Sequence, residues 1–200
     1  MINLKRGLIW YILTIGLVSI LYALDVDRFL TGTIYQVLLL GFAIAPFFKD
    51  RQNKGVLGLV KIQWWVGVLA YLIAAAASFV YNWLMVGELT LPKLDVRLLY
   101  IIALAPAGEE LFFRGYLQPA IKVKTRRWVG ILIASLLFTA AHLPKLFILQ
   151  EGIPLGLITI FIVGAVLGII REKTSSVYNS MLFHGGWNLV SIFFGGIPQG

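Results

Sequence analysis

Apolar runs of helical length alternate with short polar links along the whole chain. Each link carries charged residues, whereas few polar side chains interrupt the runs, which cover residues 8–24, 29–48, 64–86, 98–121, 128–142, 153–170 and 177–194. A helix needs about 20 apolar residues to cross the hydrocarbon core of a bilayer. Because most of the runs are close to this length, we predict an all-α fold, a polytopic transmembrane helix bundle of about seven spans.

Two places in this pattern allow a second interpretation. The first run follows a basic pair, as in a signal peptide, but it is long for such a peptide and no small-x-small cleavage site follows it. We therefore expect an uncleaved first span. The fifth run ends at His142, where Pro144 and Lys145 interrupt the pattern. A broken or re-entrant eighth segment around residues 144–152 is the alternative to a count of seven.

The composition indicates that the bilayer is the main solvent of the chain. Hydrophobic residues make up 60% of the sequence and charged residues 13%, against roughly 25% charged residues in a soluble globular domain. A water-soluble fold of this size has too little interior to bury so much apolar surface. Since no internal repeat or linker stands out, residues 1–200 are predicted to form a single integral-membrane domain. The sequence has no cysteine, which excludes a disulfide framework and thiolate metal sites.

The basic residues lie mainly in alternate links. Of the 17 Lys and Arg residues, 12 fall in the N-terminal segment and in the links at 49–61, 122–127 and 171–173, and 4 fall in the remaining links. Positively charged loops stay in the cytoplasm, which predicts a cytoplasmic N-terminus and an external C-terminus. The net charge of +8 is explained by loops near anionic lipid headgroups, so nucleic-acid binding is not expected.

Three ionisable side chains interrupt the fourth run, at Glu109, Glu110 and Arg114. Such groups are costly inside a membrane and usually have a function there. Glu110 and Arg114 are four residues apart, so they share a helix face and can pair. Glu109 points about 100° away from Glu110 and is free to face another helix. Pro106 and Gly108 loosen the helix just before the two carboxylates.

Two histidines and an asparagine lie at a similar depth in other runs. At about 1.5 Å rise per residue, Glu109 lies roughly 20 Å from the cytoplasmic end of its run, His142 roughly 22 Å and His184 roughly 16 Å. Asn188 follows His184 by one helical turn, so both side chains can converge on one small volume. Three helices thus bring ionisable groups close to the bilayer midplane, which random placement would seldom do.

These residue types suit the hydrolysis of an amide bond. A carboxylate in a low-dielectric site suits general-base chemistry near neutral pH, so Glu109 beside His142 could hold and deprotonate a water. His184 and Asn188 could donate hydrogen bonds to the oxyanion of a tetrahedral intermediate. The structural alternative is that the Glu110–Arg114 pair and Asn188 only hold helices together. That alternative explains poorly why all these groups occur together at matched depth.

Three short motifs in this region resemble those of a known family. Glu109-Glu110-Leu-Phe-Phe-Arg114 resembles its E-E-x-x-x-R motif, Phe138-Thr-Ala-Ala-His142 its F-x-x-x-H motif and His184-Gly-Gly-Trp-Asn188 its H-x-x-x-N motif. The family is that of the CPBP intramembrane proteases (CAAX protease and bacteriocin-processing, or Abi). The resemblance covers roughly residues 98–195, which we take as the catalytic core.

The resemblance implies a role for each motif residue. Glu109 would be the water-activating base, assisted by His142, and His184 and Asn188 would stabilise the oxyanion. Glu110 and Arg114 would brace the site. The resemblance also leaves open zinc bound by Glu109, His142 and His184 with an open position for water. We favour a metal-free glutamate protease without a cofactor, because no H-E-x-x-H pattern is present and an asparagine suits an oxyanion better than zinc.

We therefore predict an intramembrane endopeptidase that acts on a membrane-associated peptide or protein. Its expected location is a prokaryotic cell membrane. A non-proteolytic membrane protein of the same family, serving bacteriocin immunity or as a scaffold, is the second hypothesis. An ion-coupled transporter is the third, since buried Glu and His also mark ion pathways, but transporters often contain internal repeats and none is found. The sequence indicates neither the substrate nor the oligomeric state.

Overall fold

The fold is known from a computed structural model that describes residues 3–49, 54–60, 62–89, 95–148 and 153–195. Every regular element in these residues is a helix, which confirms the all-α prediction. The helices, in chain order, are α1 (Leu4–Ala23), α2 (Arg28–Lys49), α3 (Lys54–Leu57), α4 (Trp64–Met85), α5 (Val96–Leu99), η2 (Tyr100–Leu104), α6 (Ala105–Glu110), η3 (Leu111–Leu117), α7 (Gln118–Lys122), α8 (Arg127–Ala141), α9 (Leu143–Ile148), α10 (Ile153–Thr174) and α11 (Val177–Gly195).

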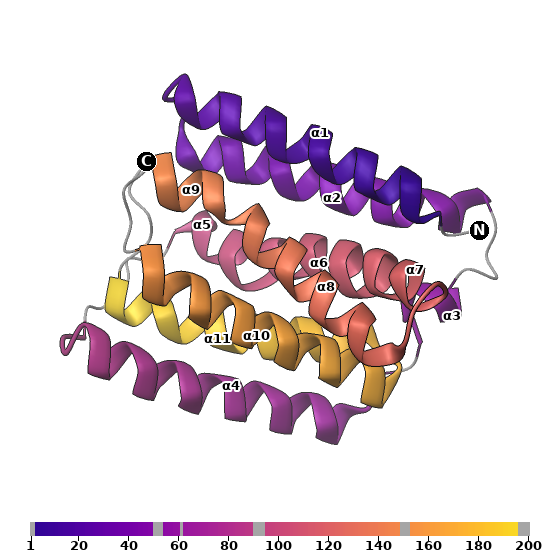
Figure 1. The fold of residues 1–200 in the computed structure, drawn as a ribbon. Coiled ribbons are helices and arrows are strands. Elements are labelled where there is room, and N and C mark those ends of the chain that lie inside the picture. The colour runs from indigo at the N-terminus through magenta and orange to yellow at the C-terminus, as the bar shows by residue number, and fades with distance from the viewer. Residues whose placement is uncertain (1–2, 50–53, 61, 90–94, 149–152, 196–200) are drawn as a thin grey trace.

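The helices lie side by side around a central segment that runs from α5 to α7 (Figure 1). The pair α1–α2 covers one side of this segment, and α4 lies on the opposite side of the bundle. Within the bundle α2 packs against α6, α8 against α10, and α4 along α11. The central segment is therefore enclosed by helices that come from both halves of the chain.

Among the described residues, five helical stretches are long and apolar enough to cross a membrane: residues 4–23, 28–45, 64–85, 127–147 and 155–174. Large apolar side chains on their outer faces are exposed, such as Ile12 (66%) and Leu72 (58%), as a lipid environment requires. The chain is thus a membrane protein, whereas the predicted count of seven spans is not established. Of the suggested eighth segment, residues 143–148 form α9 directly after α8, and 149–152 lie outside the described residues.

The central segment and α11 are absent from these five helices, and they carry most of the predicted site residues. Two π-helical stretches, η2 and η3, divide the central segment on either side of α6. Pro106 lies in the first turn of α6, where its missing N–H and fixed φ are tolerated. Stretches of π-helix inside α-helices are frequent at functional sites. The loosening was predicted at Pro106 and Gly108, but these residues lie in regular α-helix, and the π-helical stretches come before and after them.

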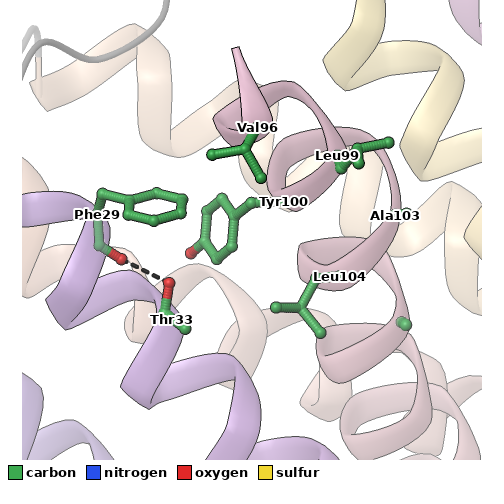
Figure 2. A pocket seen from close by; sticks show the side chains of 8 residues that line it. Phe29, Thr33, Val96, Leu99, Tyr100, Ala103 and Leu104 are labelled. Carbon is green, nitrogen blue, oxygen red and sulfur yellow. Dashed lines mark hydrogen bonds between the residues drawn. The ribbon is translucent and has the colours of Figure 1, made fainter.

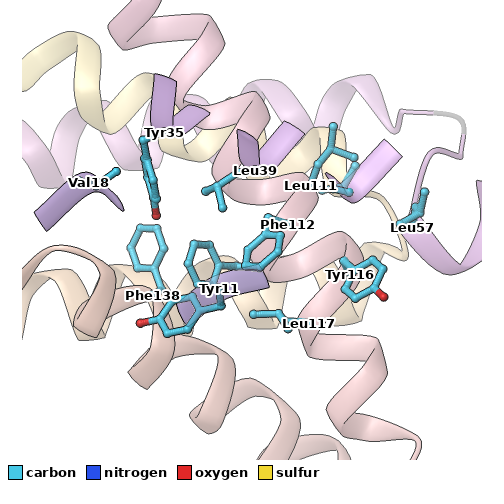
Figure 3. Close-up of a cluster of buried hydrophobic side chains, with 13 residues drawn as sticks. Tyr11, Val18, Tyr35, Leu39, Leu57, Leu111, Phe112, Tyr116, Leu117 and Phe138 are labelled. Atoms are coloured by element: carbon cyan, nitrogen blue, oxygen red, sulfur yellow. The ribbon is translucent and has the colours of Figure 1, made fainter. Parts of the chain in front are cut away.

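An aromatic core packs against the π-helical stretch η3 (Figure 3). Phe112, Phe113 and Tyr116 are at most 2% exposed. The ring of Phe113 meets that of Phe138 from α8 edge to face, with 5.3 Å between centroids, a preferred geometry for aromatic pairs. This core fixes η3 and α8 relative to each other, and with them the site residues that they carry.

Candidate active site

The carboxylate of Glu110 is buried at the end of α6 in an ion pair with Arg114. Both side chains are 0% exposed, and Arg114 Nη1 donates to Glu110 Oε1 at 3.2 Å. Arg114 Nη2 donates to the backbone carbonyl of Gly164 in α10 at 2.9 Å. Its guanidinium also lies 4.3 Å from the ring centroid of Phe138, a cation–π contact. Arg114 thus ties α8 and α10 to the segment that carries the two glutamates.

His184 lies between the two glutamates. Its Nδ1 is 3.0 Å from Glu110 Oε1, and its Nε2 is 3.7 Å from Glu109 Oε2. A carboxylate only accepts hydrogen bonds, so Nδ1–H donates to Glu110 and Nε2 faces Glu109. A separation of 3.7 Å is too long for a direct hydrogen bond, and a water bound beside the two atoms can contact both of them. With Glu109 and His184 both 6% exposed, the pair is nearly enclosed.

The second oxygen of Glu109 accepts a hydrogen bond from a residue that none of the sequence motifs includes. Gln36 Nε2 in α2 donates to Glu109 Oε1 at 2.7 Å, and Gln36 is 2% exposed. A signal was present in the sequence, because Gln36 is the only amide side chain of its apolar run. The pattern along one run does not say which helix that amide meets.

His142 joins the cluster through Phe138. It follows the last residue of α8, and its Nδ1 donates to the carbonyl of Phe138 at 2.9 Å. The Phe138 ring lies 4.8 Å from the His142 ring and 5.9 Å from the His184 ring. The two imidazoles thus pack on one phenyl ring. The expected assistance of Glu109 by His142 stays a prediction.

Asn188 is hydrogen-bonded to the central segment. Its Nδ2 donates to the carbonyl of Ile101 in η2 at 3.0 Å, so one of its two amide hydrogens ties α11 to this segment. A Cβ at Gly185 would lie 2.8 Å from the carbonyl of Ile102, and one at Gly186 would lie 2.8 Å from that of Tyr71 in α4. These glycines let α11 approach two backbones, and the approach fixes the height of His184 and Asn188.

The residues proposed for zinc do not fit a metal site. Glu109 and His184 approach each other, but the described residues include no group of three His, Cys, Asp or Glu side chains that could hold a metal ion. A catalytic zinc usually needs three protein ligands that converge on one point.

An apolar groove of about 470 Å³ opens between α2 and the start of the central segment (Figure 2). Its lining residues are all apolar apart from the hydroxyls of Thr33 and Tyr100, and comprise Phe29, Thr33, Val96, Leu99, Tyr100, Ala103, Leu104 and Ala107. Ala107 is two residues from Glu109, and Thr33 is one turn from Gln36. The groove thus lies along the two helices, α2 and α6, that carry Gln36 and Glu109.

Comparison with known proteins finds one family and two relatives. A family described as type II CAAX prenyl endopeptidase Rce1-like matches residues 91–190. An uncharacterized 24.3 kDa protein of Escherichia coli is 28% identical over 176 residues, which cover 82% of this chain and 78% of that protein. The UPF0177 protein YbdI of Lactococcus lactis is 24% identical over 157 residues, covering 70% and 80% of the two chains. No solved structure matches the chain.

Proposed function

Because the chain belongs to the Rce1-like family of type II CAAX prenyl endopeptidases, we propose that it is an intramembrane endopeptidase that hydrolyses a peptide bond of a membrane-associated peptide or protein. The observation that carries the proposal is the buried pair of Glu109 and His184, with 3.7 Å between Oε2 and Nε2. A prokaryotic cell membrane is the proposed location, and the bacterial source of both relatives supports it.

The proposed first step is attack by a water held between Glu109 and His184. Glu109 Oε2 takes a proton from the water, the water oxygen bonds to the scissile carbonyl carbon, and the carbonyl electrons move to its oxygen. The protonated Glu109 then gives the proton to the departing amine as the C–N bond breaks. General acid–base catalysis of this kind contributes about 10²- to 10⁴-fold to the rate.

His184 and Asn188 are the proposed hydrogen-bond donors to the oxyanion. The Nδ1–H of His184 already donates to Glu110, so His184 can donate from Nε2 only when both ring nitrogens carry protons. Asn188 retains one amide hydrogen beside its bond to Ile101. In this scheme Glu110 orients the imidazole, and Arg114 neutralises Glu110.

The apolar groove suits the apolar part of a membrane-embedded substrate. It is lined mainly by aliphatic and aromatic side chains, and one of its lining residues, Ala107, comes two residues before Glu109 in the chain. An apolar chain lying there would bring a neighbouring peptide bond to the carboxylate. The groove thus favours substrates anchored in the bilayer over soluble peptides.

The proposed mechanism uses no metal ion, which a chelator can test. We expect the purified protease in lipid vesicles to keep its cleavage rate after treatment with a strong zinc chelator, because Glu109 and His184 hold the water themselves. The rate is measured before and after treatment, and again after zinc is added back. Loss of cleavage that zinc restores would establish the metalloprotease alternative.

The function itself is tested in whole membranes, where every potential substrate is present at once. Cells making the native chain are compared with cells making Glu109→Gln, and new peptide termini in the membrane fraction are identified by mass spectrometry. The substitution preserves shape and an acceptor for Gln36, so folding is expected to persist. We expect termini that only the native chain produces. Identical termini in both would favour the non-proteolytic immunity or scaffold function.

A further inference from the structure

Gln36 is a buried amide in the middle of a membrane-spanning helix. It is 2% exposed, and its helix is one of the five that are long and apolar enough to cross the bilayer. An amide in such surroundings is costly unless it forms hydrogen bonds. The apolar pattern of the helix therefore does not account for an amide side chain at residue 36.

The donor end of this amide is directed at the general base. Gln36 Nε2 lies 2.7 Å from Glu109 Oε1, whereas the other carboxylate oxygen, Oε2, faces His184 Nε2. Hydrogen bonds to a charged acceptor are short and roughly twice as strong as neutral ones. Gln36 thus occupies one oxygen of the carboxylate and leaves the other toward the imidazole.

The residue before Glu109 is Gly108, and its lack of a side chain leaves room for this contact. A Cβ at Gly108 would lie 2.5 Å from Gln36 Oε1 and 2.9 Å from the Gln36 backbone carbonyl. Only glycine lets α2 and α6 approach so closely, as small residues do between membrane helices. The backbone that carries Glu109 is therefore packed directly on the backbone that carries Gln36.

We infer that Gln36 is a positioning residue for Glu109: it holds the carboxylate so that Oε2 faces His184 and the water between them. The inference rests on the proposed hydrolytic function. Without the hydrogen bond the Glu109 side chain is free to rotate, and a misplacement of about 1 Å can lower a rate by about 100-fold. Gln36 does not line the apolar groove, so substrate binding is not expected to change.

The chain offers a matched control in Gln118. This residue is also 2% exposed, donates its Nε2 to the carbonyl of Gly168 at 3.1 Å, and leaves its Oε1 unpaired. Its partner is a backbone carbonyl rather than a carboxylate. Gln36→Met and Gln118→Met therefore remove the same buried amide with similar side-chain volume, but only the first removes a contact to Glu109.

The first measurement is steady-state cleavage of a substrate identified by its new termini. Gln36→Met is expected to lower kcat about 10- to 100-fold and to change KM less than twofold. Gln118→Met is expected to change neither by more than about threefold. If Gln36→Met does not fold, Gln36→Asn is used instead. Its side chain is one methylene shorter, so the amide no longer reaches Glu109 and kcat is expected to fall likewise. Equal kcat in the native and Gln36 variants would overturn the inference.

The second measurement needs no substrate and separates this inference from the proposed function. The infrared band of the Glu109 carboxylate is identified as the band that Glu109→Gln removes. We expect Gln36→Met to shift this band and Gln118→Met to leave it in place. If the band shifts in Gln36→Met but the native chain cleaves nothing, the contact between Gln36 and Glu109 is supported and the proposed proteolytic function is refuted. An unshifted band in Gln36→Met would refute the positioning role, whatever the chain cleaves.

Discussion

His184 has a different set of neighbours from the one that its motif suggests. The motif pairs it with Asn188, four residues later, but its ring nitrogens face Glu110 and Glu109. Adjacent glutamates on one helix point about 100° apart, which lets them approach one imidazole from two sides. The central unit of the site is therefore a histidine between two carboxylates, with Arg114 balancing one of them.

The burial of Arg114 predicts how a substitution of this residue changes the stability of the fold. Arg114→Lys is expected to lower the free energy of unfolding by about 3 kcal/mol, because an ammonium cannot reproduce the planar contacts to Glu110, the Gly164 carbonyl and Phe138. The measurement is thermal or denaturant unfolding in detergent.

Arg97→Lys is the control for this prediction. Arg97 pairs with Asp95, and its side chain is 37% exposed, so that substitution is expected to cost less than about 1 kcal/mol. Equal losses in the two variants would mean that the buried network around Arg114 adds nothing to stability.

The helix types around the site could be predicted only in part. The apolar runs located the helices closely: the run 177–194 corresponds to α11 (Val177–Gly195), and 128–142 to α8 (Arg127–Ala141). Proline and glycine predicted a loosened helix just before Glu109, whereas that stretch is regular α-helix between two π-helical stretches. The position of the π-helical stretches depends on packing against other helices, which the local sequence does not contain.

The pairing of helices was not predictable from the runs. Periodicity identifies a helix and its apolar face, but it does not say which other helix that face packs against. The contact of Gln36 with Glu109 requires knowing that α2 packs against α6. The three motifs, by contrast, made Glu109, His142, His184 and Asn188 candidates, because each motif lies within one continuous helical stretch or at its end.

The close packing of α2 on α6 predicts the effect of a single methyl group. Gly108→Ala is expected to lower stability by about 1–3 kcal/mol, because the new Cβ would lie 2.9 Å from a backbone carbonyl. Gly41→Ala, in α2, meets no atom within 4 Å and is expected to be neutral or stabilising. The two variants are compared by unfolding in detergent. A Gly108→Ala variant as stable as Gly41→Ala would contradict the packing described here.

At the scale of the whole molecule, the site is assembled from helices at both ends of the chain. Residues from α2, α6, α8 and α11 converge on Glu109 or His184, although the family match begins only at residue 91. The N-terminal helices therefore take part in the site and do not only anchor it. A shortened chain limited to residues 91–190 would lack Gln36 and one wall of the apolar groove.

The orientation of the bundle can be tested because the chain has no cysteine. Single cysteines are introduced as Leu24→Cys and Val123→Cys, at positions that are 70% and 86% exposed. With the N-terminus in the cytoplasm, an impermeant maleimide should label the first in intact cells and the second only after lysis. The reverse labelling would place the basic links outside the cell.

The central claim is that Glu109 activates the attacking water. It is tested most directly by the single-turnover cleavage rate of purified native and Glu109→Gln chains in lipid vesicles, with equal thermal stability as the condition for comparison. We predict that the substitution lowers this rate by about 10²- to 10⁴-fold. A rate within threefold of the native value would contradict the account.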